Sequence, residues 1–249
     1  KRRGYDLGFI THYIIEKKIA PSHWYEISGD VLNNSEEFGG MDSAFNVDLF
    51  IKMRKAKRID DKKFVPRVLA YDIETDEIKI GQGEILMISL VSENFKKVIT
   101  WKNSKKKINN VEYVKDESEL LEKFTEYVAK ISPDFLVGYF SDGFDLPYLK
   151  ARAEKNEVKL SLGLDGSEPR FSRGIEVTGK TKGVVHVDIL KFVRTAYSQY
   201  MQSETLSLNE VANEFVGERK KDFKFKHSSK ITEDEWEKYY EYNLHDSIL

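Results

Sequence analysis

The pattern of apolar and polar residues divides the chain at about residue 67. Residues 1–66 show little periodicity. Within them, residues 5–18 are typical of a short helix, and residues 28–43, rich in Gly and Asn, are typical of a loop. We interpret residues 1–66 as part of an N-terminal domain followed by a linker. Residues 67–249 show sharper patterns and are predicted to form a second domain.

In this second part, the pattern predicts strands first and then alternating helices and strands. At residue 116, Asp is followed three residues later by Glu, which is typical of a helix start. Residues 163–183 carry Gly, Ser and Pro around alternating residues and are predicted to form a β-hairpin. The predicted strands are 68–74, 85–91, 97–101, 135–140 and 184–189; the predicted helices are 116–131, 146–155, 206–215 and 232–249. This order predicts an α/β domain with a mixed sheet.

The composition narrows the class of protein. The chain has 249 residues and no cysteine, which excludes disulfides and cysteine-based zinc sites. No apolar run approaches the roughly 20 residues of a membrane span, so we expect an intracellular protein with no membrane partner. The first residue is not Met, which predicts a fragment or a processed product. Lys and Glu are abundant while Gln is scarce, a bias that fits a thermophile.

Charge is unevenly distributed, although the net charge is only −2. Basic residues gather in three clusters, at residues 52–63, 105–107 and 219–230. Such clusters are either solvated loops or contacts to phosphate groups, and both interpretations stay open at this stage.

Two acids, Asp72 and Glu74, lie in the first predicted strand of the second domain. Residues two apart in a strand point to the same face, so the two carboxylates project together from an element that otherwise favours burial. Burying both is costly unless a positive charge neutralises them, and a divalent cation does so. An Asp-x-Glu triplet is nevertheless expected by chance in so acidic a chain.

Three further residues are candidates for the same site. Asp145 follows a predicted strand and a Gly-containing turn; it is either the N-cap of the next helix or a site residue at a strand-to-helix turn. Tyr242 and Asp246 are four residues apart and share a face of the last predicted helix. Their alternative role is an exposed polar stripe or a core tyrosine.

In the order Asp-x-Glu, Asp and Tyr-x-x-x-Asp, these residues resemble the three motifs of proofreading exonucleases that use four acids and a tyrosine. The segments Val-Leu-Ala-Tyr-Asp-Ile-Glu-Thr at 68–75 and Phe-Asp-Leu-Pro-Tyr-Leu at 144–149 resemble archaeal family-B DNA polymerases. So do Asp-Gly-Ser-Glu-Pro at 165–169 and Val-His-Val-Asp at 185–188. The resemblance covers residues 67–249 well and residues 5–20 loosely.

This resemblance implies a ribonuclease-H-like exonuclease fold in residues 67–249, acting in the 3′→5′ direction. It implies two Mg²⁺ (or Mn²⁺) ions, with Asp72 bridging both, Glu74 and Asp246 on the first and Asp145 on the second. Tyr242 would orient the attacking water, and the product would be a nucleoside monophosphate.

The implied substrate is the 3′ end of single-stranded or frayed DNA on a primer–template. Phe140 and Phe144 are candidates for base stacking, with core packing as the alternative for each. The hairpin resembles the family's strand-separating hairpin, with a mobile surface loop as the alternative. Its basic candidates for DNA contact are Arg170, Arg173, Lys180 and Lys182. The implied partners are a polymerase domain and a sliding clamp, in the nucleoid of an archaeal cytoplasm.

The sequence also departs from the family pattern. Phe140 stands where the family usually has Asn, and Gly143 where Asn or Ser is common. Residues 29–63 have no clear counterpart. No polymerase motif is present, so we expect the polymerase domain beyond Leu249 or in a separate polypeptide. Two alternative functions are a free-standing RNA- or DNA-trimming exonuclease of the same superfamily and a catalytically silent module that binds single strands.

Overall fold

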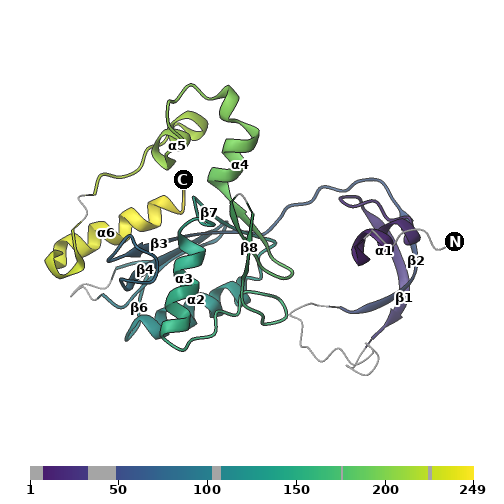
Figure 1. Ribbon diagram of the computed structural model, residues 1–249, viewed down its shortest axis with the longest axis horizontal. Coiled ribbons are helices and arrows are strands. Elements are labelled where there is room, and N and C mark those ends of the chain that lie inside the picture. The colour runs from purple at the N-terminus through teal and green to yellow at the C-terminus, as the bar shows by residue number, and fades with distance from the viewer. Residues whose placement is uncertain (1–7, 33–48, 103–107, 175, 224–225) are drawn as a thin grey trace. The chain divides into compact units, whose positions relative to one another are not determined.

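The computed structural model describes residues 8–32, 49–102, 108–174, 176–223 and 226–249 (Figure 1). The chain forms two compact units, Lys1–Val65 and Pro66–Leu249. Among the described residues, no helix has the length and apolar character needed to cross a membrane.

The first unit contains a helix and a two-stranded antiparallel ribbon. Helix α1 (Phe9–Lys17) lies inside the predicted range and has no buried residue. Strands β1 (Tyr25–Val31) and β2 (Ile51–Arg58) pair antiparallel. The loop prediction is therefore wrong for residues 28–31, where cross-strand pairing overrides local propensity; residues 33–43 lie outside the described part. The first basic cluster begins inside β2 and not in a loop, and its side chains there are exposed.

The second unit is built on a six-stranded mixed sheet in the order β10-β7-β3-β4-β5-β6. β3 is antiparallel to β4 and parallel to β7, which confirms the mixed sheet. The short edge strand β6 was not predicted. The strands are β3 (Val68–Thr75), β4 (Ile85–Ser92), β5 (Phe95–Thr100), β6 (Val111–Tyr113), β7 (Phe135–Gly138) and β10 (Val185–Asp188).

Helices cover both faces of this sheet, and the alternation along β3 decides which side chains meet them. Leu69, Tyr71 and Ile73 are buried in a cluster with apolar residues of α2 (Glu117–Ile131) and α3 (Asp145–Lys155). Asp72 and Glu74 point to the opposite face, where α6 (Glu233–Asp246) packs on β3, β4 and β5. The predicted same-face arrangement of the two acids is therefore confirmed.

Capping explains where the helices begin. The Asp116 carboxylate accepts a hydrogen bond from Glu119 N at 2.9 Å, and α6 starts with a capping box between Thr232 and Glu235. α3 has Phe144 at its N-cap, so the interpretation of Asp145 as an N-cap is wrong. α5 (Leu208–Val216) starts two residues later than predicted, after Ser207. α4 (Ile189–Ala196) was not predicted.

The predicted hairpin is present as β8 (Arg170–Arg173) and β9 (Val177–Lys180), which pair antiparallel. Two short 3₁₀ helices, Ser198–Tyr200 and Ser228–Lys230, complete the described elements. The hairpin lies against the start of α3: a Cβ at Gly179 would be 2.3 Å from Leu146 Cδ2. A larger residue at position 179 would therefore displace the Leu146 side chain.

Candidate metal centre

Three carboxylates meet on the α6 face of the sheet. Asp72 and Glu74 come from β3 and Asp246 from the last turn of α6, and one oxygen of each lies within 4.8 Å of the others. Asp246 is buried, while Asp72 and Glu74 are half-buried. Residues 172 positions apart in the chain are thus brought together because α6 packs directly on β3.

Asp145 lies beside this group and does not join it within that distance. The pairing of β3 with β7 ends at Ala70 and Val137, so Ile73 N–H lies beyond the end of β7. The Asp145 carboxylate accepts a hydrogen bond from this N–H at 3.2 Å and is 4% exposed. Burial raises the pKa of Asp145 to about 7. Asp145 therefore lies at the edge of β3, between the positions of Asp72 and Glu74.

α6 presents further polar groups to these acids. The Tyr239 hydroxyl donates to Glu74 Oε2 at 2.8 Å, and Asn243 Nδ2 donates to Asp72 Oδ2 at 2.7 Å. The predicted Tyr242 is buried and interacts with Asp246. Tyr239 and Asn243 were missed, although their spacing to Asp246 of seven and three residues places them on its helix face. That spacing is the signal that could have found them.

Lys220 was also missed, and it is the cation nearest to the acids among the described residues. Its Nζ is 2.5 Å from Asp246 Oδ2 and 4.9 Å from the centre of the Tyr242 ring. The residue lies in the irregular segment between α5 and α6, inside the third basic cluster. The sequence shows this basic cluster, but no local pattern distinguishes Lys220 from its other members. One member of that cluster therefore contacts a carboxylate of the site.

Burial and mutual repulsion raise the pKa values of these carboxylates. Burial raises the pKa of Asp72 well above its ordinary value, and the charges of Asp145, Glu74 and Asp246 add to the effect. Burial likewise raises the pKa of Glu74 to about 8, although the Tyr239 hydrogen bond opposes the shift. The pKa of Asp246 is raised by burial, against the effect of Lys220. One lysine does not neutralise the group.

The donor set fits a divalent cation. All the candidate ligands are carboxylate oxygens, the ligands that hard cations such as Mg²⁺ and Mn²⁺ prefer. Asp246 Oδ1 is buried and has no hydrogen-bond partner in the described part of the chain. A buried carboxylate oxygen without a partner is costly unless a cation satisfies it.

A cavity of about 460 Å³ opens beside the acids. Asp72 and Asp246 contribute to its wall, and the rest is mostly apolar, formed by β3, β7, α4, α5 and residues 246–249. Phe192, Val211 and Phe215 are among the lining residues. The candidate metal centre therefore adjoins an apolar space large enough for part of a ligand.

The two predicted stacking residues differ in their surroundings. Phe140 is 49% exposed and has a left-handed backbone with φ of 57°, a strained conformation for this residue type. Phe144 is half-buried, packs against the apolar core, and its ring centre is 5.3 Å from that of Tyr148. The Phe140 ring is thus half exposed, whereas the Phe144 ring packs against the core.

The predicted hairpin cations are also placed differently from one another. Arg170 and Lys180 are both exposed and lie directly opposite each other across the β8–β9 ladder. Like charges in such a pair repel unless an anion lies nearby. Lys182 makes an ion pair with Asp165 at 2.7 Å. Arg173 lies opposite Val177 at the tip of the hairpin.

Comparison with known structures gives the class of fold first. The structure of the family B DNA polymerase from Pyrobaculum calidifontis aligns with a TM-score of 0.66 at 18% identity, over 98% of this chain and 30% of that one. The expected exonuclease-type α/β fold is therefore confirmed.

The model of the exonuclease domain of DNA polymerase family B matches residues 1–211, and the chain belongs to this family. DNA polymerases of archaea are among its relatives. That of Pyrococcus glycovorans is 40% identical over 151 residues, covering 56% of this chain and 19% of its own. That of Thermococcus litoralis is 35% identical over 208 residues, covering 77% of this chain and 12% of its own. The chain thus spans less than a fifth of the length of these relatives.

Proposed function

We propose that this chain is the 3′→5′ proofreading part of a family-B DNA polymerase, which hydrolyses nucleoside monophosphates from DNA 3′ ends by two-metal catalysis. Family membership supports a nuclease, and the convergence of Asp72, Glu74 and Asp246, with Asp145 beside them, carries the mechanism. Mg²⁺ (or Mn²⁺) bound there would activate a water and stabilise the leaving oxygen.

Each residue has a role that its position supports. Asp72 lies near all three other acids, whose charges each raise its pKa, and it would be shared between the two ion sites. Glu74 and Asp246 would complete one ion site, and Asp145 would serve the other. Tyr242, buried beside Asp246, would orient the water through its hydroxyl. Tyr239, Asn243 and Lys220 hold the carboxylates in place.

The proposed substrate is a single-stranded or frayed 3′ end. The half-exposed Phe140 ring is suited to stacking on a base, and the opposed Arg170 and Lys180 are suited to phosphate contact. The whole protein would further bind a primer–template, a polymerase domain and a sliding clamp in the cytoplasm of an archaeal cell. The relatives are DNA polymerases, which supports DNA and a polymerase domain as partners, whereas the clamp rests on the family resemblance alone.

The test is release of mononucleotides from an oligonucleotide labelled at its 5′ end. We expect the chain to shorten single-stranded DNA stepwise from the 3′ end in Mg²⁺ and to stop when EDTA is added. Glu74→Gln should reduce the rate at least about a hundredfold, since removing a catalytic metal ligand removes transition-state stabilisation. Glu122→Gln, an exposed position on α2, is the matched control and should retain activity.

Other outcomes would favour the alternatives. Equal rates on RNA and DNA would favour a free-standing trimming exonuclease. Binding of DNA without cleavage, in the parent chain as in Glu74→Gln, would favour a silent module that binds single strands. Shortening from the 5′ end would contradict the proposed direction.

A further inference from the structure

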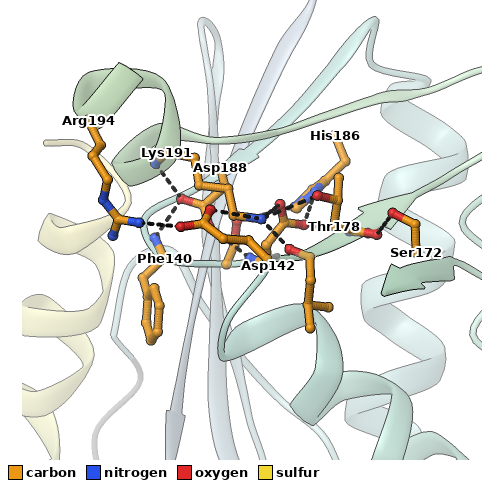
Figure 2. Close-up of polar contacts among 12 residues, drawn as sticks. Phe140, Asp142, Ser172, Thr178, His186, Asp188, Lys191 and Arg194 are labelled. Carbon is orange, nitrogen blue, oxygen red and sulfur yellow. Dashed lines mark hydrogen bonds and ion pairs between the residues drawn. The ribbon is translucent and has the colours of Figure 1, made fainter. Parts of the chain in front are cut away.

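A single buried carboxylate joins the hairpin to the turn that carries Asp145. Asp142 lies in the turn between β7 and α3, three residues before Asp145, and is 3% exposed (Figure 2). Its Oδ1 accepts a hydrogen bond from Gly179 N of β9 at 2.7 Å, and its Oδ2 accepts one from Lys191 Nζ of α4 at 2.7 Å. Asp142 is therefore bound to two other elements.

Lys191 adds further contacts between α4 and β9 at the same place. Besides Asp142, its ammonium group donates to the backbone carbonyl of Val177 and to Thr178 Oγ1, both in β9. One turn further along α4, Arg194 donates to Glu176 at 2.7 Å. The start of β9 is thus held by cations of α4: Lys191 pairs with Asp142, and both Lys191 and Arg194 lie within 4.0 Å of Glu176 (Figure 2).

On its other side, Asp142 lies close to His186, which contacts the strand that carries Asp72 and Glu74. His186 Nδ1 lies 3.2 Å from Asp142 Oδ1, and His186 Nε2 lies 3.2 Å from the Tyr71 hydroxyl. Tyr71 directly precedes Asp72. Asp188 accepts hydrogen bonds from Phe140 N and Asp142 N, at 3.1 and 3.0 Å, and so fixes the turn itself. Burial raises the pKa of Asp142, but His186, Lys191 and Gly179 N–H outweigh it and lower the pKa to about 2.

We propose that Asp142 is a positioning residue that fixes the β8–β9 hairpin relative to the metal centre. This fixed position of the hairpin is needed to cleave 3′ ends that are still paired. A single-stranded end needs only to reach the acids. A paired end must also be held apart from its complement, and the exposed cations Arg170 and Lys180, which lie opposite each other on the hairpin, would serve this only from a fixed position. The inference rests on the proposed nuclease function. It adds that Asp142 determines whether paired 3′ ends are cleaved as well as single-stranded ones.

The test compares one DNA strand in two forms, single-stranded and annealed to its complement. Asp142→Asn removes the charge while keeping the shape. We expect it to lower the rate on the annealed form about tenfold and the rate on the single strand less than about threefold, because the acids themselves are unchanged. Asp165→Asn is the matched control, because it removes an ion pair with Lys182 in the same 163–183 segment. It should leave unchanged the ratio of the rate on the annealed form to the rate on the single strand.

A second variant and a second measurement keep the test decisive. Lys191→Gln should lower the same ratio, and the double variant with Asp142→Asn should lose less than the sum of the two single losses, since both single variants remove the Asp142–Lys191 contact. Amide hydrogen exchange of residues 170–180 should accelerate in both variants. An unchanged ratio in both, or equal losses on both DNA forms, would overturn the inference. If the parent chain cleaves neither form, it is the proposed function that fails, and the inference falls with it.

Discussion

At the scale of single residues, the acids of the site bind protons when no metal is present. The pKa of Glu74 in the folded chain, about 8, is above its ordinary value, so the folded state binds the proton more tightly than the unfolded state. The stability that Glu74 contributes by binding this proton is complete below its ordinary pKa and is lost as the pH rises through about 8. Divalent cations should therefore replace protons at the site.

We expect Mg²⁺ to raise Tm by a larger amount at about pH 8.5 than at about pH 6, because protons compete with the ion at the lower pH. Thermal unfolding with Mg²⁺ and with EDTA at both values measures this difference. Glu74→Gln should lose most of the gain, whereas Glu122→Gln should keep it. A gain from Mg²⁺ that does not depend on pH would show that these carboxylates do not hold the ion.

The two phenylalanines of the turn give a second prediction at this scale. Phe140→Ala should raise KM for single-stranded DNA about tenfold, the effect of losing one stacked base, with little change in Tm because the ring is half exposed. Phe144→Ala should instead lower the free energy of unfolding by about 3 kcal/mol, because its ring packs against the core. Steady-state kinetics and urea unfolding separate the two effects. The opposite assignment of effects would contradict both roles.

The residues that the sequence identified and those it missed differ in the kind of signal they give. Asp72 with Glu74 and Tyr242 with Asp246 have the spacing of one strand face and one helix face, which local periodicity reveals. Lys220 has no such spacing, because it lies in an irregular segment and reaches Asp246 only through the tertiary fold. Contacts of this kind depend on chain packing and cannot be read from local pattern.

At the scale of elements, a buried ion pair links α2 to α3. Glu117 and Arg152 are 5% and 3% exposed, and Arg152 Nε donates to Glu117 Oε1 at 2.8 Å. The same oxygen accepts from Ile85 N at 2.7 Å, and Arg152 also donates to Gly81 O at 3.2 Å. The pair therefore fixes both helices to the turn between β3 and β4.

Removing one partner of this pair should cost much more than removing both charges. Arg152→Met leaves the Glu117 carboxylate buried without its cation, and we expect a loss of about 3–5 kcal/mol in the free energy of unfolding. Adding Glu117→Gln should restore part of that loss, because no buried charge is then unpaired. Urea unfolding of the parent chain, both single variants and the double variant measures the coupling. Additive losses would contradict a strong interaction.

Elements with a clear local signal were predicted, and those fixed by pairing or packing were not. β4 is buried on both faces and reads as an apolar run interrupted by Ser89, and α2 has both a cap and an apolar face. β6 has three residues and exists through its pairing with β5. α4 begins directly after β10 with Asp188 as its N-cap, and the apolar residues at that junction read as a continuation of the strand. Short elements at junctions carry too few residues for a periodic signal.

At the scale of the whole molecule, the second unit contains everything that the proposed chemistry uses. Both buried apolar clusters consist of residues from Leu69 onward, and the acids, Lys220 and the hairpin are all in Pro66–Leu249. Helix α1 of the first unit has no buried residue. The core and the candidate site are thus formed within one unit.

A chain of residues 66–249 alone should therefore fold and cleave single-stranded DNA. We expect its Tm to lie within about 3 °C of that of the parent chain, because the buried apolar clusters are retained in full. Its rate on a single-stranded oligonucleotide should stay within about twofold, because every acid of the site is retained. Binding of longer DNA should weaken and depend less on salt, because the exposed cations of β2 are lost. A shortened chain that aggregates or does not melt cooperatively would instead show that residues 1–65 complete the fold of the nuclease unit.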